Sequence, residues 1–322
     1  MLAIRIHEIG GADKLCADEI PLPVPKPGEV RIRVEAAGLN FIDTYNRSGL
    51  YPVPLPFTLG QEAAGIITAL GEGVSGLKPG DRVATAGGSG CYAQEAVAPA
   101  SRVVRTPEGI SSRQAAAVLA QGVTAHFLAC DTFPLKPGDT ALVHAAAGGV
   151  GLLLVQIAKL RGARVIATAG TDEKAAIARE AGADEVIVYT RDDFAAATRR
   201  LTGGRGVDVV YDGVGKQTFA GSLDSLRPRG LLATYGNASG AVPPFAPLLL
   251  AQKGSLFITR PTAVHYTQTQ AELQARASDL FGWMERGELN VRVCAEFPLA
   301  QAAEAHRAIE GRRTTGKVLL VP

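Results

Sequence analysis

The stretch Gly138-Asp-Thr-Ala-Leu-Val-His-Ala-Ala-Ala-Gly-Gly-Val-Gly151-Leu-Leu-Leu-Val-Gln-Ile-Ala-Lys159 reads as a strand, a glycine turn and a helix in immediate succession. A strand that ends near His144 would lead into a turn in which Gly148 and Gly149 let backbone N–H groups approach a pyrophosphate. Gly151 would let the following helix pack closely against the sheet. The stretch therefore predicts a site for a nicotinamide dinucleotide.

The surrounding sequence strengthens this prediction. Ala146 occupies the first glycine position of the usual G-x-G-x-x-G pattern, so the motif alone is weak. The apolar run 150–160 suits a buried helix, and the run 163–168 reads as a second strand, which completes a βαβ unit. The alternative is a glycine-rich turn in some other α/β protein, and the surrounding sequence favours the dinucleotide-binding turn.

Length and composition indicate a two-domain enzyme. A chain of 322 residues exceeds what one core normally supports, and its 47% hydrophobic residues can bury two. With 33 basic and 31 acidic residues the net charge is +2, so nucleic acid and membranes are not indicated as partners. The first residues read as a short alternating strand without a signal-peptide core, and no apolar run approaches the ~20 residues of a membrane span. We expect a cytoplasmic protein.

The four cysteines are widely separated along the chain, which favours reduced thiols over a disulfide framework or a zinc knuckle. They are Cys16, Cys91, Cys130 and Cys294.

The order of expected elements predicts two kinds of domain. The first part is rich in strands, with candidates at 29–35, 65–70 and 81–85 separated by Pro and Gly, and this pattern indicates a mostly antiparallel domain. After an alanine-rich helix from Ser112, strand and helix signals alternate, which indicates a parallel doubly wound α/β sheet. Its strands are expected at 141–143, 164–167, 185–189, 207–211, 230–235 and 255–259.

The end of the chain has a different pattern and is expected to return to the first domain. It contains helical stretches at 271–286 and 301–310, a strand at 291–295 and a last strand at 317–321. The predicted division is residues 1–117 with 262–322, and residues 118–261 as the dinucleotide domain. A cleft between the two would face the carboxyl ends of the parallel strands, where such sheets bind ligands.

Five segments of the sequence carry a resemblance to a known family. They are Asn40–Tyr51, Gly60–Gly65, Gly138–Lys159, Tyr235–Asn237 and Gly254–Pro261. These segments resemble the zinc-free quinone oxidoreductase branch of the medium-chain dehydrogenase/reductase superfamily, which includes zeta-crystallin. The resemblance covers essentially the whole chain and is closest to bacterial NADPH:quinone oxidoreductases. It implies a Rossmann sheet and a mostly β, GroES-like catalytic domain.

The resemblance also bears on metal chemistry. Zinc-dependent members place two cysteines and a histidine at positions that here resemble Asn40, Gln61 and Gln121. Amides are poor zinc ligands, and the four closely spaced cysteines of a structural zinc lobe are absent from the sequence. No metal is therefore expected. A quinone or conjugated enone already presents an electrophilic centre to hydride, so its reduction depends mainly on positioning.

The expected catalytic residues are polar side chains of the first domain. They are Asn40, Asp43, Tyr45, Tyr51 and Gln61. For Tyr45 and Tyr51, ordinary aromatic packing is as good an interpretation as a substrate role. Asp43 is expected to orient the cofactor or a neighbouring side chain, and the proton donor stays open.

NADPH is the expected cofactor. NAD-specific sites place a carboxylate at the tip of the second strand, whereas this strand ends in Thr168-Ala-Gly-Thr171 without an acid. Lys174 and Tyr189 would meet the 2′-phosphate, as the matching residues do in the resembling reductases. Asp172 and Glu173 count against this choice, although acids at a helix start are common.

The remaining cofactor contacts are implied by the resemblance. They are Phe41, Ile42 and Asp43 of the first domain, Thr124, Phe127, Gly148, Gly149, Val150, Gly170, Thr171, Val214, Gly236, Asn237 and Arg260 of the dinucleotide domain, and Arg313 of the tail. His144 is interpreted as a packed core residue.

These observations predict an NADPH-dependent quinone reductase. One alternative is reduction of the activated C=C bond of an enal or enone, and another is an NADPH- or RNA-binding role of the crystallin kind. The resemblance implies a homodimer built through the cofactor domain, with residues 240–251 as candidate interface.

Overall fold

The computed structural model describes residues 1–322, which form two compact units. Unit 1 comprises Met1–Ala120, Thr267–Arg286 and Val291–Pro322, and unit 2 comprises Gln121–Tyr266 and Gly287–Asn290. No helix of the structure has both the length and the apolar character needed to cross a membrane.

Unit 1 contains two sheets. The smaller has the antiparallel order β2-β1-β4, and the larger has the order β15-β16-β3-β5-β6-β8 with β7 paired to β3. The strands are β1 (Leu2–Ile6), β2 (Cys16–Glu19), β3 (Glu29–Leu39), β4 (Phe57–Thr58), β5 (Glu62–Leu70), β6 (Arg82–Ala86), β7 (Glu95–Pro99), β8 (Val103–Arg105), β15 (Val293–Pro298) and β16 (Lys317–Val321). The main helices are α1 (Phe41–Ser48), α9 (Gln270–Glu285) and α10 (Ala302–Glu310), with short 3-10 turns at Ala12–Lys14, Ala100–Arg102 and Leu299–Gln301.

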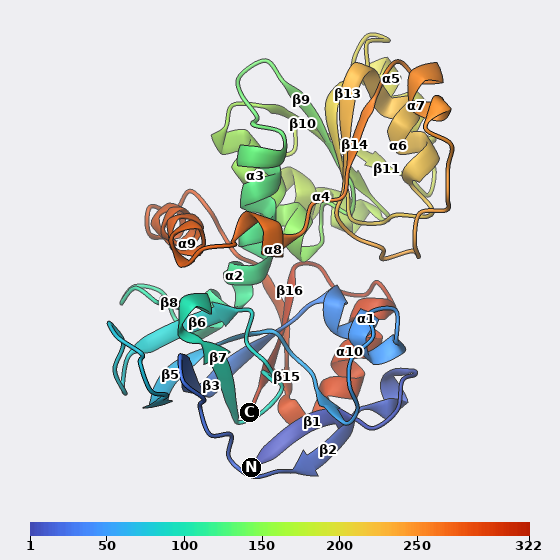
Figure 1. The fold of residues 1–322 in the computed structure, drawn as a ribbon. Coiled ribbons are helices and arrows are strands. Elements are labelled where there is room, and N and C mark those ends of the chain that lie inside the picture. Colours follow the sequence, from blue (N-terminus) through green and yellow to red (C-terminus); the bar gives the residue numbers. More distant parts are fainter. The chain divides into compact units, whose positions relative to one another are not determined.

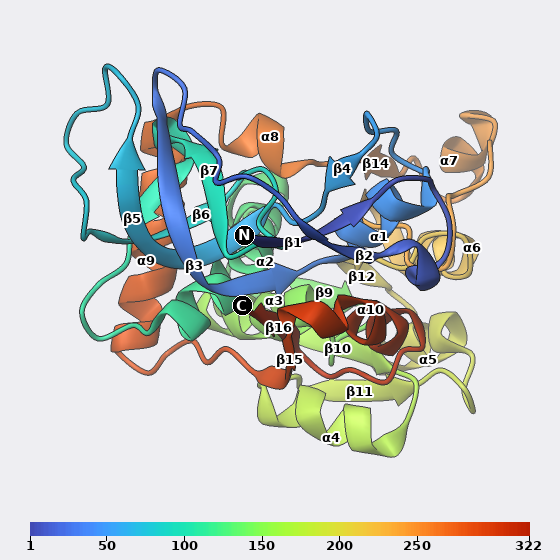
Figure 2. The ribbon, with the colours of Figure 1, turned by 90° about the horizontal axis from the view of Figure 1, so that it is seen from below.

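The tail of the chain completes the larger sheet of unit 1. β16 pairs parallel to β15 on one side and antiparallel to β3 on the other. The alternation of β3 buries Val30, Ile32 and Val34, which pack into the unit's apolar cores. α10 packs alongside β15 and β16 (Figure 2). The strand predicted at 317–321 is therefore confirmed, and so is the mostly antiparallel character of this part of the chain.

Unit 2 is a six-stranded parallel sheet with helices between its strands (Figure 1). The strand order is β11-β10-β9-β12-β13-β14. The strands are β9 (Thr140–Val143), β10 (Arg164–Ala169), β11 (Glu185–Val188), β12 (Val207–Asp212), β13 (Leu226–Thr234) and β14 (Phe257–Thr259). The helices are α3 (Gly149–Leu160), α4 (Asp172–Glu180), α5 (Phe194–Leu201), α6 (Phe219–Ser225), α7 (Leu248–Gln252) and α8 (Ala263–Tyr266). The predicted doubly wound sheet is confirmed.

One long helix, α2 (Ser112–Phe127), carries the chain from unit 1 into unit 2 and continues into a π-helical turn at Leu128–Thr132.

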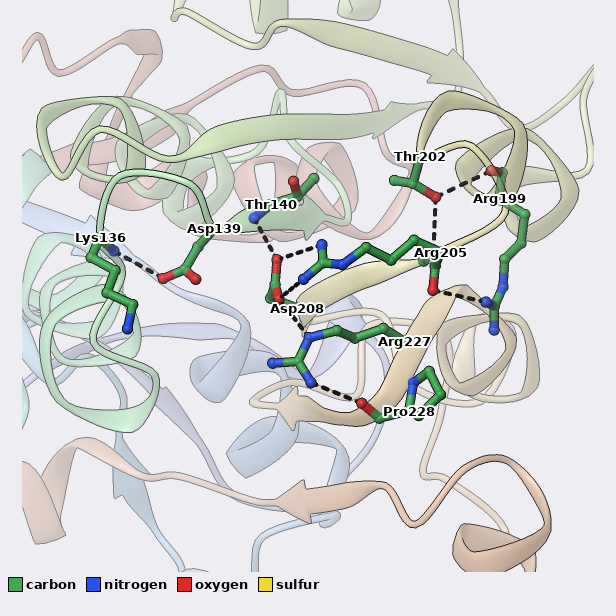
Figure 3. Close-up of polar contacts among 10 residues, drawn as sticks. Lys136, Asp139, Thr140, Arg199, Thr202, Arg205, Asp208, Arg227 and Pro228 are labelled. Carbon is green, nitrogen blue, oxygen red and sulfur yellow. Dashed lines mark hydrogen bonds and ion pairs between the residues drawn. The ribbon is translucent and has the colours of Figure 1, made fainter.

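The amino ends of three neighbouring strands in unit 2 are fixed by one buried carboxylate (Figure 3). Asp208 of β12 is 2% exposed and accepts a hydrogen bond from the Thr140 backbone N–H of β9 at 2.8 Å. Arg205 bonds both of its oxygens, and the Nε of Arg227 in β13 lies 2.6 Å from Oδ1. Burial raises the pKa of the Asp208 carboxyl, but the hydrogen bonds from the two arginines outweigh it and the pKa is lowered. These hydrogen bonds thus hold the amino ends of β9, β12 and β13 together, at the end of the sheet opposite the glycine turn.

Candidate functional site

The glycine turn after β9 has the geometry of a phosphate cradle. Gly148 is the N-cap of α3, and a Cβ added there would meet only the carbonyl oxygen of Ala145, at 3.1 Å. The N–H groups in the first turn of α3, which contains Val150, have no intrahelical acceptor and add to the positive end of the helix dipole. At Gly151 a Cβ would lie 2.4 Å from the Ala145 oxygen, so this glycine permits the close helix packing that the sequence predicts.

Gly149 is required for a reason that the sequence did not show. A Cβ there would lie 2.0 Å from Oε1 of Gln121, so the Gln121 carboxamide rests directly on the first residue of α3. The sequence comparison marks Gln121 only as a position where zinc enzymes carry a ligand. The structure instead places its side chain at the glycine turn of unit 2.

The strand that precedes the turn is anchored by His144. Its ring is 1% exposed, with Nδ1 at 2.9 Å from Thr168 Oγ1 and Nε2 at 3.1 Å from Ser222 Oγ. Burial lowers the pKa of this imidazole. The prediction that His144 is a packed core residue is confirmed.

Polar groups also organise the carboxyl ends of β12, β13 and β14. The buried Asp212 accepts hydrogen bonds from the backbone N–H groups of Val214 at 2.8 Å and Gly215 at 3.0 Å. Arg260, which follows β14, donates from Nη1 to the Thr234 carbonyl at the end of β13. The residues predicted at these strand ends, including Gly236 and Asn237, therefore lie at one edge of the same sheet.

An aromatic stack lies beside the end of α2 in unit 2. The rings of Phe127 and Tyr266 are 4.4 Å apart and inclined by 8°. Phe127 is 1% exposed, so its ring is packed in the interior. Thr124 lies one helical turn before it on α2. The sequence predicted Phe127 and Thr124 near the nicotinamide and did not identify Tyr266.

Several residues that the sequence predicted to bind the cofactor lie at the carboxyl end of β10. Gly170 follows β10, and a Cβ there would lie 2.8 Å from the hydroxyl of Tyr189. Thr171 caps α4, and its hydroxyl accepts the Lys174 backbone N–H at 3.2 Å. Four residues that the sequence predicted for the cofactor, Gly170, Thr171, Lys174 and Tyr189, are thus brought together here.

In unit 1, Asn40 is part of a buried ion-pair network. Lys317 Nζ lies 2.5 Å from Glu62 Oε2 and 2.9 Å from Asn40 Oδ1, while Asn40 Nδ2 donates to Glu62 Oε2 at 2.8 Å. The other oxygen of Glu62 accepts the backbone N–H of Ala120 at 2.6 Å. The side chains of Lys317 and Glu62 are 0% and 1% exposed. The two charges orient the Asn40 amide and compensate each other away from water.

Asp43 is a further buried polar residue, linked to this network through Asn40. Its Oδ2 accepts the Asn40 backbone N–H at 2.8 Å and the Tyr92 hydroxyl at 2.9 Å. Its Oδ1 is buried without a hydrogen-bond partner. Burial raises the pKa of this carboxyl to about 6, against the lowering effect of its hydrogen bonds. Asp43 therefore positions α1 and Tyr92.

The other predicted residues of unit 1 lie on and after α1. Tyr45 and Tyr51 pack edge to face with ring centroids 5.3 Å apart, and Phe41 lies 6.3 Å from Tyr45. Ile42 is partly buried on the same helix. The carbonyl of Gln61 accepts the backbone N–H groups of Gly87 and Gly88. Arg313 is exposed in the turn between α10 and β16. Their roles toward a ligand stay predictions.

This arrangement defines the class of protein. A mostly β unit of GroES-like type, joined by one helix to a doubly wound sheet with a glycine turn after its first strand, belongs to the medium-chain dehydrogenase/reductase superfamily. Residues 26–108 match the alcohol dehydrogenase GroES-like domain, and residues 149–276 match the zinc-binding dehydrogenase domain.

Within this class the chain belongs to the quinone oxidoreductase family. It is 47% identical to a quinone oxidoreductase of Pseudomonas aeruginosa, with 99% of each chain covered. It is 42% identical to a 2-haloacrylate reductase of Burkholderia sp, covering 100% of this chain and 99% of the relative. The crystal structure of Escherichia coli quinone oxidoreductase complexed with NADPH superimposes with a TM-score of 0.98 at 43% identity, covering all of both chains.

Sequence reasoning missed several residues that organise the site. They are Glu62, Tyr92, Gln121 as a neighbour of the glycine turn, Asp212, Tyr266 and Lys317. One signal was present in the sequence: Lys317 is the single charge at the head of an otherwise apolar strand, although its partner Glu62 is 255 positions away.

Proposed function

We propose that this chain is an NADPH-dependent quinone reductase that needs no metal. The observation that carries the proposal is the tip of the second strand in unit 2, where Gly170 and Tyr189 meet beside Lys174. No carboxylate ends β10 itself, and that space suits a 2′-phosphate. The E. coli relative solved with NADPH supports the same choice.

NADPH, when bound, would supply the hydride. On unit 2 we propose that the first turn of α3 binds the pyrophosphate, that Lys174 and Tyr189 bind the 2′-phosphate, and that Arg260 with Gly236 and Asn237 lines the cofactor's other end. The Gly148 turn fits this group, because the space that a Cβ would occupy there is open apart from one backbone oxygen.

On unit 1 we propose that Tyr45 and Tyr51 offer flat surfaces to a planar acceptor. Asn40 would be a positioning residue, because Lys317 and Glu62 fix its amide. Asp43 would hold the start of α1, since one of its oxygens bonds the Asn40 backbone. Gln61, Phe41, Ile42 and Arg313 are proposed as further contacts to substrate or cofactor.

A second candidate is reduction of an activated C=C bond. Identity of 42% with the 2-haloacrylate reductase favours it, and stacked geometry delivers hydride to either acceptor. Oxidation of NADPH is followed by absorbance with 1,4-benzoquinone and, separately, with 2-chloroacrylate, both in the presence of a chelator. Faster turnover of the quinone is expected. Turnover of the acrylate alone would favour the second candidate, and tight NADPH binding without any turnover would favour a non-catalytic role.

The proposal includes a cytoplasmic homodimer built through unit 2. β14 is an edge strand that pairs only with β13, and Phe257 on it is 61% exposed. Leu248 is 65% exposed in the predicted interface segment. Light scattering is expected to give the mass of two chains, and Phe257→Asp is expected to shift it toward one. A monomeric parent chain would refute this part.

A further inference from the structure

In unit 2, the turn after β11 is hydrogen-bonded to the turn after β10, near the carboxyl end of β10. After β11, the Thr190 hydroxyl donates to the carbonyl of Gly170 at 3.1 Å, and the Tyr189 hydroxyl lies against the same glycine. Arg191 then reaches the first residue of α4, with Nη1 and Nη2 at 2.8 and 2.7 Å from the two oxygens of Asp172. The turn after β11 therefore forms one side of the space at the tip of β10.

Asp172 is the acid at the start of α4 that Arg191 contacts, and like the neighbouring Glu173 it opposes NADPH. It is the first residue of α4, two positions after Gly170, and its side chain is 71% exposed. A carboxylate at this edge favours ribose hydroxyls and repels a 2′-phosphate. The amino end of α4 stabilises the carboxylate charge, so the helix does not remove the repulsion.

Arg191 supplies the opposite charge. Its contact with Asp172 is bidentate, the geometry in which guanidinium and carboxylate pair best. Hydrogen bonding to Asp172 raises the pKa of the guanidinium, which keeps it charged. Only one N–H of each terminal nitrogen is needed for this pair, and the side chain is 60% exposed, so the guanidinium keeps further N–H donors in contact with solvent.

We propose that Arg191 sets the preference of this chain for NADPH over NADH by neutralising Asp172. The inference rests on the proposed NADPH-dependent function. It adds the residue that allows NADPH to bind although Asp172 stands at the start of α4. Asp172 then no longer competes with Lys174 and Tyr189 for the 2′-phosphate, while Glu173, the other acid at the start of α4, is the same in the parent and in every variant below. Without Arg191, the first turn of α4 would carry an uncompensated carboxylate three residues beyond the end of β10, close to the place where NAD sites carry theirs.

The test measures dissociation constants of NADPH and NADH by titration calorimetry on the intact protein. Arg191→Met is expected to weaken NADPH about tenfold, because a full negative charge is restored near the phosphate, and to change NADH less than about twofold. Asp172→Asn in the Arg191→Met background is expected to restore NADPH binding to within about threefold of the parent. Arg191→Lys is expected to lie between, since it keeps the charge and loses the bidentate geometry.

The matched control is another exposed ion pair of unit 2, between Lys159 and Asp184 at 2.8 Å. Lys159→Met is expected to leave the ratio of the two constants unchanged. An unchanged ratio in Arg191→Met, or no recovery in the double variant, overturns the inference, as does a parent that binds NADPH without preference. A parent that binds neither dinucleotide refutes the proposed function itself.

Discussion

Replacing Lys317 by methionine tests the buried ion pair of unit 1. The substitution removes an ammonium that lies 2.5 Å from Glu62 Oε2, where both side chains are at most 1% exposed. Glu62 would keep its hydrogen bonds from Asn40 and Ala120 but would lose its counter-charge. Breaking one side of such a pair costs about 3–5 kcal/mol in the free energy of unfolding. With a urea slope of about 2 kcal/mol/M, the midpoint is expected to fall by roughly 1.5–2.5 M.

The chain provides its own reporter for this measurement. Trp283, the single tryptophan, lies in unit 1, so its fluorescence follows the unfolding of that unit. Two controls separate charge from packing. Glu62→Gln combined with Lys317→Met is expected to recover most of the loss, because neither buried charge remains. Arg113→Met breaks an exposed pair with Glu296 and is expected to change the free energy of unfolding by less than about 1 kcal/mol.

A midpoint that moves by less than about 0.3 M in Lys317→Met would refute the reasoning, because the slope then leaves under about 1 kcal/mol for the pair. Failure of the double variant to recover would refute it in another way. It would show that the alkyl stem of Lys317, and not its charge, stabilises the strand.

Three further predictions concern single positions. The Asp43 carboxyl has its pKa raised to about 6, so the folded state holds its proton more tightly than the unfolded state. The parent is therefore expected to lose up to about 3 kcal/mol of stability as pH rises from about 4 to 6, and Asp43→Asn to lack this slope in urea titrations at several pH values. Asp208 has the opposite shift, so its contribution is present above pH ~4 and is lost as pH falls through its lowered pKa. Asp208→Asn is expected to destabilise unit 2 by about 1.5–3 kcal/mol at pH 7, because it weakens the charge-assisted hydrogen bonds while both arginines stay partly exposed, and equal calorimetric melting of variant and parent there would contradict this. Gly149→Ala is expected to displace the Gln121 carboxamide and weaken NADPH several-fold in calorimetric titrations, with Gln121→Ala in the same chain restoring affinity; an unaltered affinity in Gly149→Ala would count against the close contact.

The elements of unit 2 could be predicted because each is specified locally. Apolar runs, glycine turns and helix starts alternate along the chain, and the observed strands fall close to the expected ranges. The main difference is β13, which was expected at 230–235 and begins at Leu226. Pro228 made its first residues resemble a turn. The structure keeps them in the strand with an irregular register against β12 and with Arg229 at φ 59°.

The candidate site was predictable only where one segment specifies it. The glycine turn and the carboxyl end of β10 each consist of a few consecutive residues, so a cofactor-binding role can be predicted from their residue types alone. The network of Asn40, Glu62 and Lys317 depends on pairing between β16 and β3, which no local pattern encodes. The Arg191 pair likewise depends on β11 lying beside β10, although the two residues are only 19 positions apart.

The placement of β16 between β15 and β3 has a consequence for synthesis on the ribosome. Residues 121–266 of unit 2 emerge as one continuous stretch and can fold as soon as they are clear of the exit tunnel. Unit 1 begins first but cannot close its larger sheet until residues 317–321 appear, and until then Glu62 lacks its ammonium partner. Unit 1 therefore begins before unit 2 and is completed after it. In a nascent chain stalled before Lys317, we expect proteases to cut unit 1 while unit 2, which binds the dinucleotide, is already protected.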